Sequence, residues 1–74
     1  MSSTTEAIRE QLMANNQEYQ RLLEEHARYA AQLEELSRKR YLTEQEEREE
    51  VRLKKLKLRA KDRMEMLIQR ARVA

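Results

Sequence analysis

The sequence contains no cysteine, no proline and no glycine. Without cysteine the chain has no disulfide framework, and a single histidine excludes a self-contained zinc site built from Cys and His ligands. A chain without disulfides is typical of a reducing compartment. We therefore expect a protein that carries neither a metal nor another cofactor.

Long apolar runs are also missing. No stretch approaches the roughly 20 apolar residues of a membrane span, and the first ten residues lack the apolar core of a signal peptide. Aromatic residues make up 4% of the chain, whereas charged residues make up 41%. A chain of 74 residues buries little surface and usually needs help to be stable. We expect a soluble, cytoplasmic protein that associates with itself.

Apolar residues of the first half recur at alternating steps of three and four, the pattern of a coiled-coil seam. They are Ile8, Leu12, Tyr19, Leu22, Tyr29, Leu33 and Leu36. Carried forward unchanged, this seam would run through Lys54, Lys57 and Lys61, whereas the apolar residues of the second half lie on a shifted face. One straight helix would bury neither half. The break near residues 41–43 therefore indicates two helices folded back on each other.

Capping signals set the helix boundaries within a single domain of residues 1–74. Ser3 followed by Glu6, and Thr43 followed by Glu46, have the spacing of a capping box. The first helix is predicted over about 4–37, the turn over about 38–43 and the second helix over about 44–72. Asn15 and Asn16 form the weakest point of the first helix, because Asn prefers caps and turns to helix interiors.

The sequence thus predicts an all-α fold, an antiparallel two-helix hairpin that resembles a coiled coil. Residues 1–47 carry six basic and ten acidic groups, and residues 48–74 carry ten basic and four acidic groups, which favours the two arms lying side by side. A pairing that sets Tyr29 opposite Leu53 also sets Leu12 near Ala71. The predicted intramolecular seam is Leu12, Tyr19, Leu22, His26, Tyr29, Leu53, Leu56, Ala60, Met64, Leu67 and Ala71.

The same pairing leaves apolar surface uncovered near the turn, because Leu33 and Leu36 lie opposite glutamates. A second hairpin would cover this surface and give a four-helix bundle, so we expect a dimer. Val51 and Leu58, seven residues apart on the back of the second helix, are a rival contact surface. The candidate self-association residues are Leu33, Leu36, Tyr41, Leu42, Val51 and Leu58.

Residues suited to catalysis are few. His26 is the one imidazole and falls within the seam, where we interpret it as a packing residue with one hydrated edge. The Ser and Thr residues lie at predicted helix ends, where capping explains them. Carboxylates without a concave apolar pocket keep ordinary pKa values. We expect no enzymatic activity and no small-molecule substrate.

A basic row follows one flank of the second helix. Its members are Arg48, Arg52, Lys55, Arg59 and Arg63, while Lys54, Lys57 and Lys61 line the other flank. Charges that flank a coiled-coil seam commonly pair with acids of the facing helix, and this is the first interpretation. The alternative is contact with an anionic partner, either nucleic acid or a membrane surface. The segment lacks aromatic residues for base stacking, which counts against nucleic acid.

Several motifs between His26 and Ile68 carry a family resemblance. They are His26 with Leu33 and Glu34, the Tyr41-Leu42-Thr43 turn followed by acids, and VRLKKLKLRAKDRM from Val51 to Met64, with Leu58, Lys61 and Asp62 in a Leu-x-x-Lys-Asp pattern. This stretch resembles the YdcH-like family of small bacterial proteins of unknown function. Ala60 stands where a larger aliphatic residue is more usual, and Leu56 where a polar residue is usual. The resemblance implies a helical hairpin and brings no established activity.

Two hypotheses of function follow. The first is a non-enzymatic module for protein–protein interaction and self-association. The second is a binder of nucleic acid or anionic membrane through the basic face of the second helix.

Overall fold

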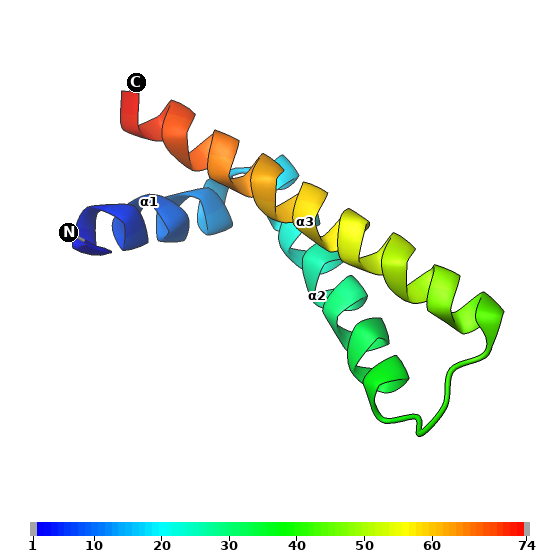
Figure 1. Ribbon diagram of the computed structural model, residues 1–74. Coiled ribbons are helices and arrows are strands. Elements are labelled where there is room, and N and C mark those ends of the chain that lie inside the picture. Colours follow the sequence, from blue (N-terminus) through cyan, green and yellow to red (C-terminus); the bar gives the residue numbers. More distant parts are fainter. Residues whose placement is uncertain (1, 74) are drawn as a thin grey trace.

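The chain folds into three helices, seen in a computed structural model that describes residues 2–73, with side chains from Thr4 onward. Helix α1 spans Ser2–Asn15, α2 spans Gln17–Ser37 and α3 spans Glu44–Val73 (Figure 1). No strand occurs within the described range. The predicted all-α class is confirmed. The expected two-helix chain is corrected, because the first predicted helix is divided into α1 and α2.

Asn16 divides the two shorter helices. Its backbone is extended, with φ −114° and ψ 111°, and its Oδ1 accepts a hydrogen bond from Tyr19 N at 2.8 Å. The side chain therefore caps the first turn of α2, which is the role that Asn performs better than it performs a helix interior. On the other side of the break, Gln20 Nε2 donates to Met13 O and satisfies a carbonyl at the end of α1.

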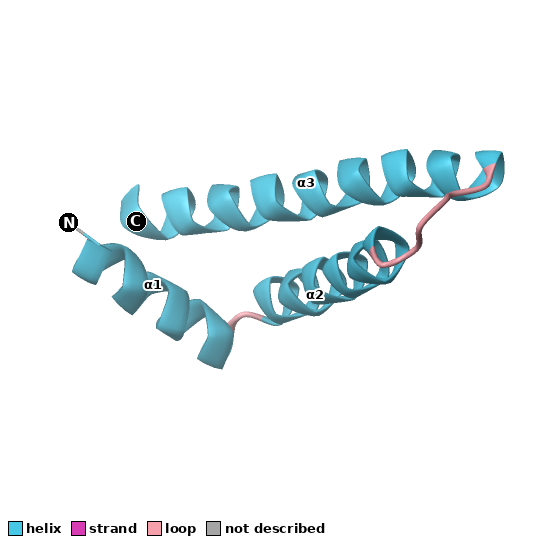
Figure 2. Ribbon diagram, turned by 60° about the horizontal axis from the view of Figure 1, so that its bottom comes forward, coloured by secondary structure: helices cyan, strands magenta, loops and turns pink. Residues whose placement is uncertain are grey.

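Helix α3 runs beside both shorter helices (Figure 2). It packs mainly against α2, and against α1 near the carboxyl end of α3, while α2 and α3 run in opposite directions on either side of the 38–43 connection (Figure 1). One ion pair joins α2 to α3, from Arg63 Nε to Glu18 Oε2 at 2.9 Å. None of the described helices combines the length and the apolar character needed to cross a membrane.

The direction of α1 departs from the predicted pairing. Arg9 Nη2 lies 4.0 Å from Glu65 Oε2, whereas a continuous first helix would have placed Arg9 near the end of the chain. Ile8 and Leu12 pack against the cluster of Tyr19, Met64, Leu67 and Ile68. Ala71, expected in the seam opposite Leu12, is exposed. The prediction for Ala71 is wrong because the break at Asn16 turns α1 toward an earlier part of α3.

The core lies between α3 and the two shorter helices. Among the described residues, the buried ones are Tyr19, Leu53, Ala60, Met64, Leu67 and Ile68. Of these, Ile68 was absent from the predicted seam. The half-buried members of that seam are Leu12, Leu22, His26, Tyr29 and Leu56.

Helix α3 begins with a reciprocal capping box. Glu46 N donates to Thr43 Oγ1 at 3.1 Å, and Thr43 N donates to Glu46 Oε1 at 2.9 Å. Lys39, in the connection, also donates to Glu46 Oε2. The corresponding box expected at Ser3 lies outside the described contacts, because the Ser3 side chain is not described; α1 already includes the Ser3 backbone.

The hydrogen bond from Lys39, followed by that from the Thr43 backbone, holds the pKa of Glu46 below its usual value of 4.5. Because the folded pKa lies below the unfolded one, this contact stabilises the fold above pH 4.5 and is lost as the pH falls through the folded pKa. A carboxyl NMR titration should give Glu46 a midpoint below 4.5, and Lys39→Met should raise that midpoint. Lys55→Met, which removes a lysine outside this contact, should leave it unchanged. A midpoint insensitive to Lys39→Met would contradict the pairing.

Candidate functional site

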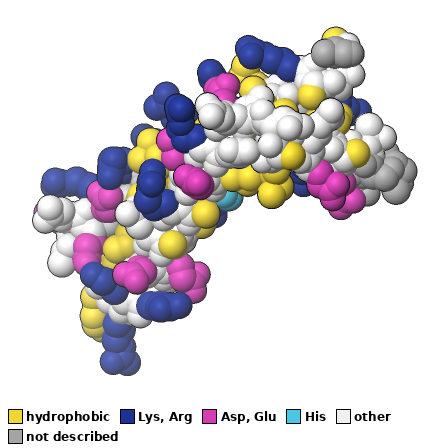
Figure 3. Space-filling view, turned by 180° about the vertical axis from the view of Figure 1, so that it is seen from behind, with side chains coloured by type: hydrophobic (Ala, Val, Ile, Leu, Met, Phe, Trp, Pro, Cys, Tyr) yellow, Lys and Arg dark blue, Asp and Glu magenta, His cyan; other side chains and the backbone are white. Residues whose placement is uncertain are grey.

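A groove of about 750 Å³ opens where the three helices meet. Helix α1 contributes Arg9 and Met13, while α2 and α3 supply the remaining lining. The apolar lining consists of Met13, Tyr19, Leu23, Leu33, Leu58, Met64 and Ile68. Figure 3 shows hydrophobic side chains gathered on one face of the molecule, with the His26 imidazole beside them.

The groove has a buried floor, and the side chains of its walls are exposed to solvent. Tyr19, Met64 and Ile68 are buried in the floor. Met13 on the α1 side is 53% exposed and Leu58 on the α3 side is 57% exposed. Apolar side chains that gather in one concave place, unlike apolar residues scattered over a surface, mark a site of contact with another molecule.

One rim of the groove is positively charged. Lys54, Lys57 and Lys61 follow steps of three and four along α3, so they share one side of the helix. None of these lysines forms an ion pair with the described part of the chain. Glu65 is the one acidic residue among the lining side chains, and it already lies near Arg9. The rim therefore presents unneutralised positive charge beside apolar surface.

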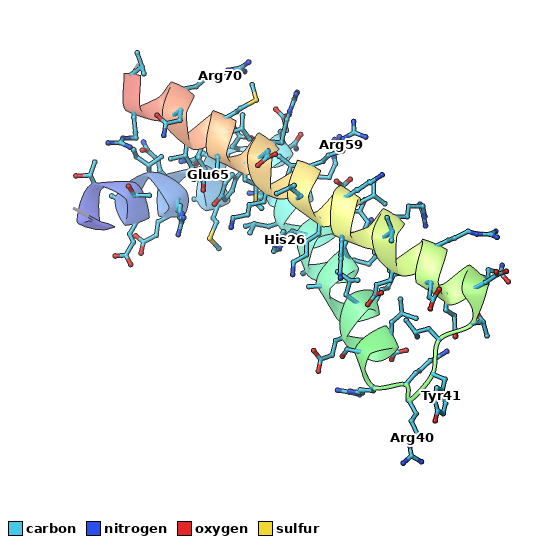
Figure 4. The ribbon with its side chains drawn as sticks, viewed as in Figure 1. His26, Arg40, Tyr41, Arg59, Glu65 and Arg70 are labelled. Atoms are coloured by element: carbon cyan, nitrogen blue, oxygen red, sulfur yellow. The ribbon has the colours of Figure 1, made fainter. Side chains whose placement is uncertain are left out.

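His26 of α2 is half-buried and lines the groove together with residues of α1 and α3 (Figure 4). Within residues 2–73, no group of three or more His, Cys, Asp or Glu side chains is placed to hold a metal ion. The imidazole lines the groove together with lysines and apolar side chains. The packing role expected from the sequence stays a prediction for this residue.

The residues of the predicted basic row differ in their contacts, because some of them form ion pairs and others do not. Arg48 lies 3.9 Å from Glu44, and Arg52 Nη2 lies 2.8 Å from Glu49 Oε2, both within α3. Arg63 alone reaches an acid of another helix, Glu18. Lys55 and Arg59 are exposed and form no ion pair within the described part of the chain, and Arg59 projects away from α2 (Figure 4).

The candidate self-association residues do not form one surface. Leu33 and Leu58 both line the groove, whereas Leu36 lines a separate hollow beside Leu53, and Val51 lines another beside Arg48. Tyr41 is 85% exposed at the tip of the connection, as Figure 4 shows, and Leu42 is half-buried. The set therefore separates into a groove pair and four residues near the connection, which we call the loop-end group although Leu36 and Val51 line different hollows: Leu36, Tyr41, Leu42 and Val51.

Sequence reasoning missed two contributors to the groove, Arg9 and Met13. Both lie on α1, and their contribution depends on the direction that α1 takes after Asn16. Helical periodicity describes the faces of one helix and carries no information on that direction. The row of Lys54, Lys57 and Lys61 could be predicted from its spacing, but its position beside an apolar groove could not.

No family model, curated protein or solved structure matches this chain.

Proposed function

We propose that the chain is a non-enzymatic helical module for protein–protein interaction and self-association. The observation that supports binding to another protein is the open groove, in which Met13 and Leu58 remain more than half exposed beside a buried apolar floor. Burying an aliphatic side chain contributes about 1.5 to 3 kcal/mol, so a partner that covers this surface gains substantial binding energy. The lining offers apolar contact and fixed charge, the features of a macromolecular contact surface.

The unit of self-association in this proposal is the hairpin of α2 and α3, and two copies pack through their loop-end groups into a four-helix bundle. A two-fold interface brings the same patch of both copies together, so it requires a surface that is compatible with itself. The loop end has this property because it mixes both signs of charge, in Lys39 with Glu46 and Arg52 with Glu49. Its apolar members Tyr41 and Val51 are exposed. The resemblance to the YdcH-like family of small bacterial proteins implies a helical hairpin, which is the unit that this proposal uses.

Sedimentation equilibrium tests self-association directly. The native chain should be dimeric in the tens of micromolar, and its melting temperature should rise with protein concentration. Replacing Tyr41 with Ser and Val51 with Gln should weaken the dimer at least about tenfold, because both side chains lose apolar burial.

Met66→Gln is the matched control, since Met66 is also about half exposed on α3 and lies outside the loop-end group. It should leave the dimer intact. A native protein that stays monomeric throughout the micromolar range would refute self-association.

A second candidate function is binding to nucleic acid or an anionic membrane through the basic face of α3. It is supported by Lys55 and Arg59, which are exposed and unpaired among the described residues. Arg48, Arg52 and Arg63 already meet carboxylates, which leaves a smaller free charge than the sequence suggested. Binding of this kind would weaken steeply with salt and would be lost on charge reversal at Lys55 and Arg59.

A further inference from the structure

We propose that the groove binds an amphipathic α-helix of a partner protein, one that carries acidic side chains beside its apolar stripe. This inference rests on the proposed interaction function and adds the chemical class of the partner. The site comprises the apolar floor between α2 and α3, the row of Lys54, Lys57 and Lys61, and the α1 wall with Arg9 and Met13.

The dimensions and chemistry of the groove suit a helix. Its α3 side extends from Lys54 to Ile68, which corresponds to roughly 21 Å at 1.5 Å per residue and hence to about four turns of a docked helix. Two methionines, Met13 and Met64, line it. Methionine side chains are flexible and polarisable, and they adapt to the irregular apolar face that a helix presents. Helix-in-groove recognition uses such a surface.

The positive charge of the rim favours a partner whose docked helix is negatively charged. Lys54, Lys57 and Lys61 repeat at helical spacing, so acids at matching spacing on a docked helix would meet them in a row. Within the lining only Glu65 is acidic, and its carboxylate is shared with Arg9 at 4.0 Å. A basic or neutral helix would leave this positive rim unneutralised. Electrostatic complementarity of this kind sets specificity and association rate.

A second copy of the chain fits the groove poorly. A two-fold contact through the groove would bring the lysine rows of both copies together, and like charges across an interface are unfavourable. Within the described residues of a folded copy, α2 is already packed against α3 and is therefore not free to dock as a separate helix. Nucleic acid is disfavoured as well, since the floor is apolar and the aromatic ring that lines it, Tyr19, is buried.

Two synthetic peptides of about 16 residues provide the probe, a length that gives about four helical turns. Both carry the same leucine stripe, flanked by glutamates in one and by lysines in the other. Fluorescence anisotropy with the full chain should show at least about tenfold tighter binding of the acidic peptide. Added salt should weaken this binding without abolishing it, because the apolar floor still contributes.

Charge-reversal variants locate the binding site. The triple variant Lys54→Glu, Lys57→Glu and Lys61→Glu should weaken binding of the acidic peptide at least about tenfold. The control Lys55→Glu, Arg59→Glu and Arg70→Glu makes the same change in net charge at exposed residues of α3 outside the groove, and should change the affinity less than about threefold. Circular dichroism of both variants checks that helix content is retained.

Two variants of apolar residues complete the experiment. Leu58→Gln removes an exposed leucine from the groove wall and should weaken peptide binding, while Met66→Gln removes a comparably exposed side chain elsewhere on α3 and should not. If the acidic peptide binds no better than the basic one, or if both charge variants lose binding equally, the inference is overturned. Binding of anionic vesicles or single-stranded DNA that depends on Lys54, Lys57 and Lys61, without peptide binding, overturns it too.

The two proposals fail separately. A chain that dimerises without binding the acidic peptide overturns the groove inference and leaves self-association standing. A monomeric chain that binds the peptide through Lys54, Lys57, Lys61 and Leu58 overturns self-association and supports the groove inference.

Discussion

Replacing Leu53 with Ala is expected to lower the free energy of unfolding by about 2 to 5 kcal/mol. Leu53 is 2% exposed and is the largest fully buried side chain among the described residues. Truncation removes three carbon atoms from the contact between α2 and α3 and leaves a cavity that rigid helices close only in part. A chain of 74 residues has a total stability of roughly 4 to 11 kcal/mol, so this one change removes a large share.

Urea unfolding followed by far-UV circular dichroism measures the effect, at one fixed protein concentration so that association does not shift the midpoint. Leu58→Ala is the control, because it deletes the same atoms at a site that is 57% exposed. It should lower stability by less than about 1 kcal/mol. Equal losses at the two positions would mean that Leu53 is not the main contact between α2 and α3.

Replacing Ile68 with Asp should destabilise the chain by at least about 3 kcal/mol. Ile68 is 3% exposed and lies in the cluster on which Ile8 and Leu12 pack. The change removes apolar burial and places a carboxylate against Tyr19, Met64 and Leu67 in the buried cluster. The contacts between α1 and α3 should be lost first, and the methyl NMR signal of Ile8 should move to its position in an unfolded chain.

Ala71→Asp provides the matched comparison. Ala71 is exposed, so an added carboxylate stays hydrated, and the free energy of unfolding should change by no more than about 0.5 kcal/mol. Comparing the two variants tests the observed packing against the pattern expected from the sequence, which placed Ala71 in the seam and omitted Ile68. A larger loss at Ala71 than at Ile68 would show that α1 continues the direction of α2 in solution.

Local features of this chain were readable from the sequence because their causes lie within a few residues. The capping box at Thr43 and Glu46 needs only a hydroxyl and a carboxylate three residues apart, and both hydrogen bonds form. The weakness at Asn15 and Asn16 was likewise readable. The direction that the chain takes at this point was not readable. The preference of Asn for a cap predicts an interruption of the helix, but it leaves open the angle at which the next helix starts.

The groove could be predicted only in part, for the same reason. The row of Lys54, Lys57 and Lys61 follows from helical spacing, and so does the position of Leu58 on a neighbouring part of α3. Their meeting with Met13 and Arg9 depends on the path of α1, which is set by tertiary packing on Met64, Leu67 and Ile68. A seam that assumed continuous helices therefore placed Leu12 beside Ala71 instead of on this cluster.

Because of the Asn16 cap, we expect α1 to detach from the rest of the fold as a separate unit. The cap satisfies Tyr19 N from the residue that directly precedes α2, so we expect α2 to keep its first turn whether or not α1 is docked. Helix α1 has 14 residues, a length at which an isolated helix is marginal in water, and it is held by Ile8, Leu12 and the exposed pair of Arg9 with Glu65. Its amide protons should therefore exchange through sub-global fluctuations that leave α2 and α3 folded. Each such opening would remove the Arg9 and Met13 wall, so we expect the groove to alternate between a walled and an open form while the α2–α3 surface stays unchanged.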